Sequence, residues 1–276
     1  MATKTWRSLA AVGGLSMLAA ALAGCGAQAR PAPPALRPLD ALAQRRLFFG
    51  HQSVGDDILE GVGRELAARG AAAPRVMELA EGAELPAGTL AHRKLGRNEA
   101  PLSKLEAFAQ QLERTPQVDV AFLKFCYVDI DARTDVAALF ARYRATFQAL
   151  EARHPRTTFV HFTVPLTTVQ RGPGAWLKAL RGSAPWGAAE NARREAFNAL
   201  LRSSYAGKAP VFDLARLEAT APDGRAERFE HAGASLPALV PAYTEDGSHL
   251  NAEGQAWVAR HLLDFLAALP ARAGEG

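Results

Sequence analysis

The sequence predicts one α/β domain in which helices cover both faces of a mainly parallel, five-stranded sheet. Short apolar runs rich in β-branched and aromatic residues alternate with longer segments in which apolar residues recur at helical spacing. Beyond residue 40 the composition does not shift and no internal repeat occurs, which indicates a single domain.

The predicted strands are short, and the strongest covers residues 118–125. Its nearly continuous apolar sequence, VDVAFLKF, is typical of a central strand that is buried on both faces. We expect strands at residues 47–49, 75–79, 118–125, 157–164 and 209–214. We expect the main helices at residues 56–68, 101–112, 135–153, 188–205 and 251–269, and long connections at residues 80–100, 166–186 and 215–248.

Residues 1–24 are typical of a signal for export. Lys4 and Arg7 form a basic start, and the apolar run at residues 9–22 is too short for a comfortable membrane span. The run ends in Leu-Ala-Gly-Cys25, which resembles the lipobox of bacterial lipoproteins, whose cysteine is lipidated. The alternative is an ordinary signal peptide that is cleaved near Ala27 or Ala29. A lipidated Cys25 anchors a protein to a membrane without spanning it.

We therefore expect an exported, lipid-anchored envelope protein, on the periplasmic side of the outer membrane if the source is Gram-negative. Its parts are a leader (1–24), a lipidated cysteine with an Ala/Pro-rich tether (25–40), the domain (41–270) and a tail (271–276). Because the chain has 2 cysteines, lipidation of Cys25 leaves Cys126 without a disulfide partner. Loss of Lys4 and Arg7 with the leader lowers the formal net charge from +4 to +2, and no nucleic-acid partner is expected.

A pair near the C-terminus and a serine near the start of the domain suggest covalent catalysis. Asp246 stands three residues before His249, so its carboxylate can fix the tautomer of the imidazole and stabilise its charged form. Ser53 follows the first strand, and a serine hydroxyl becomes a nucleophile when a neighbouring base takes its proton. The alternative is that Ser53 only caps the helix that follows.

These two stretches, the second reading Asp-Gly-Ser-His-Leu-Asn-Ala-Glu-Gly from residue 246, resemble the GDSL/SGNH hydrolase superfamily over residues 45–268. The resemblance implies a flavodoxin-like α/β/α fold and a Ser53–His249–Asp246 triad that needs no cofactor. It implies an ester-bearing small molecule or glycan as substrate. Where the family has Gly-Asp-Ser, this chain has His-Gln-Ser53, and Val128 stands where the family's third block has an oxyanion-binding Asn.

One oxyanion donor of the family is thus absent from its usual position, and such a donor contributes about 2.7–4 kcal/mol. We expect the N–H groups of Ser53 and Gly96 and the side-chain amide of Asn98 to form the oxyanion hole. The alternative is that Asn98 is a turn residue.

Further candidates line or support the expected cleft. His51 either shapes the pocket or bonds backbone, Tyr127 is a candidate pocket residue, and Trp176 either lines the cleft or packs its loop. Lys124, in an apolar strand, needs a partner, either Asp129 or Asp131, or is structural. The histidines and cysteines show no metal-ligand spacing, so no metal is expected. Alternatives to an envelope esterase are a catalytically silent glycan-binding lipoprotein and a sugar O-acyltransferase.

Overall fold

The computed structural model describes Met1 and residues 39–71, 74–80, 83–181 and 184–270. Cys25 and residues 271–276 lie outside this part of the chain, as does all of the expected leader except Met1.

The main sheet is parallel throughout, with the strand order β2-β3-β1-β4-β5-β6. Its strands are β1 (Arg46–His51), β2 (Arg75–Glu78), β3 (Thr89–Lys94), β4 (Val120–Leu123), β5 (Thr158–Phe162) and β6 (Val211–Phe212). The predicted parallel α/β class is confirmed, but the expected count of five strands is wrong. The additional strand is β3, in a segment that we expected to be a loop.

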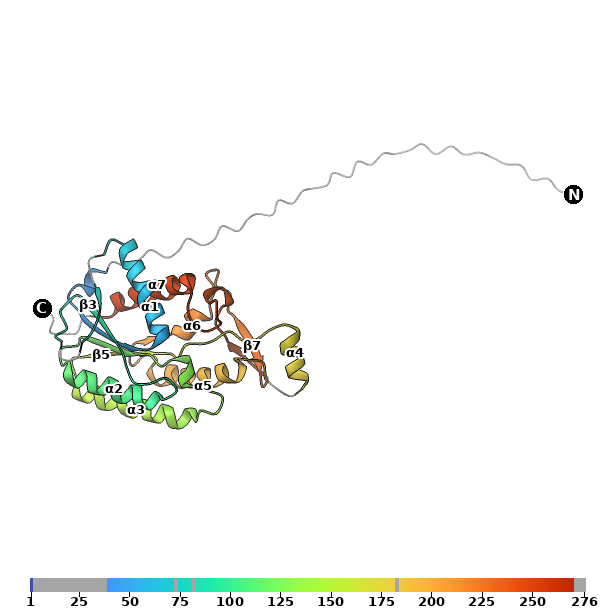
Figure 1. Cartoon of the computed structure of the whole chain (residues 1–276), viewed down its shortest axis with the longest axis horizontal. Helices are drawn as coiled ribbons and strands as arrows, with labels where there is room; N and C mark the ends of the chain where they lie inside the picture. The colour runs from blue at the N-terminus through green and yellow to red at the C-terminus, as the bar shows by residue number, and fades with distance from the viewer. Residues whose placement is uncertain (2–38, 72–73, 81–82, 182–183, 271–276) are drawn as a thin grey trace. The chain divides into compact units, whose positions relative to one another are not determined.

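Helices cover both faces of this sheet (Figure 1). One face carries α1 (Ser53–Ala68) and α7 (Ala252–Ala268); the other carries α2 (Pro101–Arg114), α3 (Val136–Arg153) and α5 (Ala188–Tyr205). Side chains of β1 alternate between the two cores, with Leu47 and Phe49 facing α1 and α7 and Phe48 facing the other layer. Burial on both faces explains why the central strands have nearly continuous apolar sequences.

The expected connections contain short elements that the sequence pattern did not reveal. These are α4 (Pro173–Leu180), α6 (Leu214–Glu218) and an antiparallel hairpin of β7 (Arg228–His231) and β8 (Ala234–Pro237). Among the described residues, no helix has both the length and the apolar character that crossing a membrane requires.

The strand order places a topological switch at β1. The chain first builds β2 and β3 on one side of β1 and then crosses to add β4 on the other side. In parallel α/β sheets, ligands bind outside the carboxyl ends of the strands at such a switch. The residues that follow β1 and β4, among them Ser53 and Cys126, therefore lie where a site is expected.

Candidate active site

Ser53 is the first residue of α1 and directly follows the turn after β1. The N-cap position belongs to Gln52, and the polar contacts of Ser53 Oγ in the described structure are with other side chains and not with the helix backbone. Its Oγ lies 3.1 Å from Nε2 of His249 and 3.8 Å from Sγ of Cys126. The hydroxyl is therefore directed toward an imidazole 196 residues later in the chain, away from the helix backbone.

A tight loop holds the acid and the imidazole. Nδ1 of His249 donates to Oδ2 of Asp246 at 2.7 Å, while Oδ1 of Asp246 accepts the N–H groups of Ser248 and His249, each at 2.8 Å. Partial burial opposes ionisation of Asp246, but the hydrogen bonds from His249 and Ser248 outweigh it and lower the pKa of the carboxyl well below its usual range. Because Nδ1 carries the proton, Nε2 is free to accept the Ser53 O–H.

Contacts from elements distant in sequence fix this loop. Asp57, one turn after Ser53 on α1, accepts the Leu250 N–H at 3.2 Å, and Thr168 N–H donates to the Gly247 carbonyl at 2.9 Å. Burial raises the pKa of Asp57. Asn251 then caps α7 by accepting from the N–H groups of its first turn. The serine and the histidine are thus positioned by a shared framework of α1 and the start of α7.

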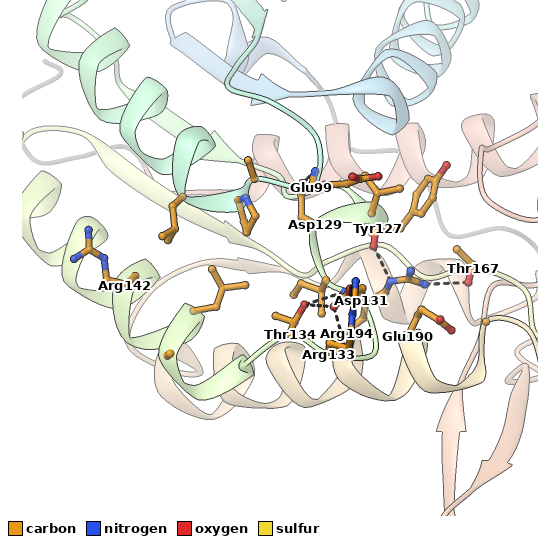
Figure 2. Close-up of a pocket in the computed structure, with 18 of the residues that line it drawn as sticks. Glu99, Tyr127, Asp129, Asp131, Arg133, Thr134, Arg142, Thr167, Glu190 and Arg194 are labelled. Carbon is orange, nitrogen blue, oxygen red and sulfur yellow. Dashed lines mark hydrogen bonds and ion pairs between the residues drawn. The ribbon is translucent and has the colours of Figure 1, made fainter. Parts of the chain in front are cut away.

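A cavity of about 960 Å³ lies next to the triad, but Ser53, Asp246 and His249 are not among the residues that line it. Figure 2 shows its lining. Tyr127 lines it, and the Tyr127 ring meets the His249 ring edge-on with 5.6 Å between centroids. Trp186 lines it as well and packs against Gly247, where any side chain would come within 3.4 Å of the Trp186 ring. Both aromatic residues therefore connect the cavity wall to the segment that carries Asp246 and His249.

Comparison with solved structures identifies this architecture. The chain is similar to a GDSL-like lipase from Bacteroides thetaiotaomicron, at 13% identity over 85% of this chain and 93% of that chain, with a TM-score of 0.50. It is similar to a candidate acylhydrolase from Bacteroides fragilis, at 16% identity over 81% of this chain and 86% of that chain, with a TM-score of 0.50. The chain has the GDSL/SGNH hydrolase fold. At these identities the similarity shows the fold alone. No family model matches the sequence, and no curated protein does so either.

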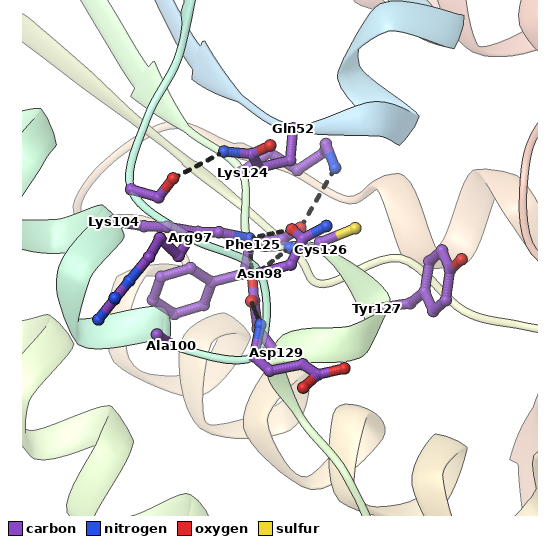
Figure 3. A network of polar contacts seen from close by, with 12 residues as sticks. Gln52, Arg97, Asn98, Ala100, Lys104, Lys124, Phe125, Cys126, Tyr127 and Asp129 are labelled. Atoms are coloured by element: carbon purple, nitrogen blue, oxygen red, sulfur yellow. Dashed lines mark hydrogen bonds and ion pairs between the residues drawn. The ribbon is translucent and has the colours of Figure 1, made fainter.

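Asp129, in the segment after β4, supports a buried polar network (Figure 3). Lys104 and Asp129 form an ion pair in which neither side chain is exposed. Asp129 also accepts the N–H groups of Cys126 and Glu99, at 2.6 and 3.0 Å. The loops after β3 and β4 are thereby joined through one carboxylate.

The same lysine orients Asn98. Lys104 Nζ donates to Asn98 Oδ1 at 3.0 Å, and because an ammonium group can only donate, the amide nitrogen must point away from it. Neither that nitrogen nor the Gly96 N–H has an acceptor among the described residues. Gly96 has φ 62°, and a Cβ there would lie 2.6 Å from the Lys104 nitrogen, so the turn requires glycine.

His51, the last residue of β1, does not line the cavity, so the expectation that it shapes the pocket is wrong. It is 1% exposed; its Nδ1 donates to the Gln52 carbonyl at 3.0 Å and its Nε2 contacts Nδ1 of His92 at 3.0 Å. Burial lowers the pKa of His51 to about 4, so the ring is neutral at pH 7. The expectation of a backbone bond is met. Trp176 lies in α4, but its side chain is outside the described part of the structure.

Sequence reasoning missed several residues of the site. Lys104 had a signal, since it stands on the apolar face of α2 together with Leu105 and Phe108. The expected pairing of Lys124 with Asp129 or Asp131 is wrong, because Asp129 pairs with Lys104 and Asp131 with Arg133. Lys124 Nζ instead donates to the Phe125 carbonyl at 3.3 Å. Within the described ranges, no group of three or more His, Cys, Asp or Glu residues could hold a metal ion.

Proposed function

We propose that this protein is a serine hydrolase that cleaves carboxylic esters. The observation that carries the proposal is the continuous contact from Ser53 Oγ to His249 Nε2 (3.1 Å) and from His249 Nδ1 to Asp246 Oδ2 (2.7 Å). Nucleophile, base and orienting acid stand in the order that acyl transfer requires. Their position at the switch point of an SGNH fold supports the same conclusion.

The reaction follows from this order. His249 Nε2 takes the proton of Ser53 as Oγ attacks the ester carbonyl, and a tetrahedral oxyanion forms. His249 then gives this proton to the departing alcohol, which leaves Ser53 acylated. Water attacks the acyl group with His249 again as base, and the acid is released. Throughout, Asp246 keeps the proton on Nδ1 and stabilises the imidazolium.

We assign the oxyanion hole to three N–H donors. Ser53 N–H lies at the N-terminus of α1, where backbone donors have no partner within the helix. The Gly96 N–H and the Asn98 amide lie in the loop after β3, and Lys104 holds the amide with its nitrogen free. In this proposal Asn98 supplies from the second block the donor that Val128 cannot supply from the third.

The test is hydrolysis of 4-nitrophenyl acetate by the purified protein and its variants. Ser53→Ala and His249→Ala are expected to lose at least about 10³-fold in kcat. Ser203→Ala is the matched control, because Ser203 is an exposed serine on α5 whose Oγ donates to a carbonyl of its own helix. Equal rates in Ser53→Ala and the unsubstituted protein would remove Ser53 from its role.

Product analysis separates hydrolysis from transfer. With an acetylated glycan and water as acceptor, free acetate and the deacetylated glycan should appear in equal amounts. Acetate that moves to a second sugar would identify an O-acyltransferase with the same triad. Glycan binding without any turnover would identify a catalytically silent protein.

For the N-terminus we propose lipidation at Cys25, on the sequence evidence alone. In a bacterial host the full chain should fractionate with membranes and carry the mass of a lipidated N-terminal cysteine. The Cys25→Ser variant should be released from the membrane fraction. Membrane attachment that survives this substitution would contradict the assignment.

A further inference from the structure

Arg194, on α5, is a cation in the wall of the cavity beside the triad. It is 4% exposed and lines the cavity together with Tyr127 and Thr167 (Figure 2). Its Nε donates to the Tyr127 carbonyl at 2.9 Å, and its Nη1 donates to Thr167 Oγ1 at 3.0 Å and to Asn191 Oδ1 at 2.7 Å. Three of its five N–H groups are thus held in place by neutral acceptors.

The guanidinium has no carboxylate in direct contact within the described residues, although Glu190 and Glu218 act on it at longer range. Its hydrogen bonds from Nε and Nη1 all go to neutral oxygens, and neither N–H of Nη2 has an acceptor among the described residues. Burial lowers the pKa of Arg194 to about 10, so it stays charged at pH 7. A buried cation is costly without a counter-ion, and a guanidinium fork is suited to a carboxylate.

The guanidinium is one aromatic ring away from the proposed base. Its Cζ lies 5.7 Å from the centre of the Tyr127 ring, whose edge-on contact with His249 is described above. A ligand group bound at Arg194 is therefore separated from the His249 ring by the Tyr127 ring, a span that a sugar ring can cover.

The rest of the cavity suits a sugar. Trp186, which is 51% exposed, offers a flat apolar surface, and Thr167 and Glu190 add polar groups. A volume of about 960 Å³ exceeds the needs of a short acyl chain and accommodates a larger alcohol moiety. Glu190, one helical turn before Arg194, is an anion that repels negative charge on a bound ligand.

We propose that this cavity binds the alcohol part of the ester and that Arg194 selects alcohols that carry a carboxylate, that is, O-acylated acidic sugars. This rests on the proposed esterase function. Hydrolysis releases the acyl group as an acid and returns the sugar hydroxyl, while the sugar carboxylate stays bound at Arg194 and is unchanged.

The test compares an O-acetylated methyl glucuronoside with the same compound whose carboxylate is blocked as a methyl ester. We expect kcat/KM to favour the free carboxylate by about 10- to 100-fold, the value of one charge-assisted contact. Arg194→Met should abolish this preference, Arg194→Lys should keep part of it, and Glu190→Gln should increase it. Arg153→Met, in an exposed pair with Glu113, should leave the preference unchanged.

Two results would overturn the assignment: equal hydrolysis of the free and blocked sugars, or an Arg194→Met variant that slows both by the same factor. Arg194 also donates to the Tyr127 carbonyl, so Arg194→Met could lose the preference through local misfolding. Misfolding cannot explain a gain of preference in Glu190→Gln. Calorimetry of Ser53→Ala with oligoglucuronate and with a neutral glucan of equal length gives an arm that needs no turnover. If no ester is cleaved, the esterase proposal is wrong. If Ser53→Ala binds both glycans with equal affinity, the proposed role of Arg194 is wrong.

Discussion

Replacement of Lys104 by Met should destabilise the domain strongly, because it leaves a buried carboxylate without its cation. Neither Lys104 nor Asp129 has an exposed side chain, and Asp129 would keep only the N–H groups of Cys126 and Glu99 as donors. Loss of one partner of a buried pair costs about 3–5 kcal/mol. That is a large part of the roughly 5–15 kcal/mol that stabilises a typical domain.

Urea unfolding followed by circular dichroism measures this loss of unfolding free energy directly. In thermal unfolding, the melting temperature should fall by about 6–20 °C for a domain of this size. Lys94→Met is the matched control. Lys94 pairs with Asp56 at 2.9 Å, but these side chains are 59% and 42% exposed. An exposed pair of this kind contributes about 0–1 kcal/mol.

A second variant separates lost charge compensation from lost packing. Lys104→Met with Asp129→Asn removes the buried negative charge while keeping an acceptor for one backbone N–H, and it should recover more than about 1 kcal/mol relative to Lys104→Met alone. The reasoning is refuted if Lys104→Met is as mild as Lys94→Met, or if neutralising Asp129 gives no recovery.

Three further predictions follow from the same structure. Asn98→Ala should lower kcat for nitrophenyl acetate by about 10²–10³-fold. It should also lower the unfolding free energy by about 1–3 kcal/mol, because it removes an acceptor of the buried Lys104 ammonium. An unchanged kcat would restore the turn-residue interpretation. Asp246→Asn should lower kcat by about 10⁴-fold by allowing the wrong His249 tautomer, and a loss below tenfold would make Asp246 incidental. Burial raises the pKa of Glu218 to about 8, so between pH 4.5 and 8 the unfolded chain loses a proton that the folded chain keeps. The free energy of unfolding should therefore fall as pH rises through this range, and Glu218→Gln should remove up to about 1.4 kcal/mol of that decline per pH unit. Parallel curves of unfolding free energy against pH for the variant and the unsubstituted protein would contradict this.

The helices and central strands could be predicted because their patterns are local. Strand β4 is apolar on both faces, and the five long helices carry apolar stripes that face one layer of the core. Strand β3 escaped prediction because only its first three residues are buried and its second half is His-Arg-Lys. Its strand state depends on pairing with β1, which no local pattern records.

The site shows the same division. Asp246 and His249 could be predicted because they stand three residues apart in the sequence. Ser53 could be predicted because it lies at a strand-to-helix turn. Lys104, on α2, and Asp129, after β4, are 25 residues apart and meet only when the segment after β4 packs against α2. Arg194 looks like an ordinary helix residue in the sequence, and its burial against Tyr127 appears only in three dimensions.

The most direct test of the central claim is covalent labelling with a fluorophosphonate, followed by peptide mass spectrometry. Such a probe reacts with a serine only when a neighbouring base activates it. We expect one adduct, on Ser53, which disappears in His249→Ala. A protein that hydrolyses esters while Ser53 stays unlabelled, or an adduct on another serine, would contradict it.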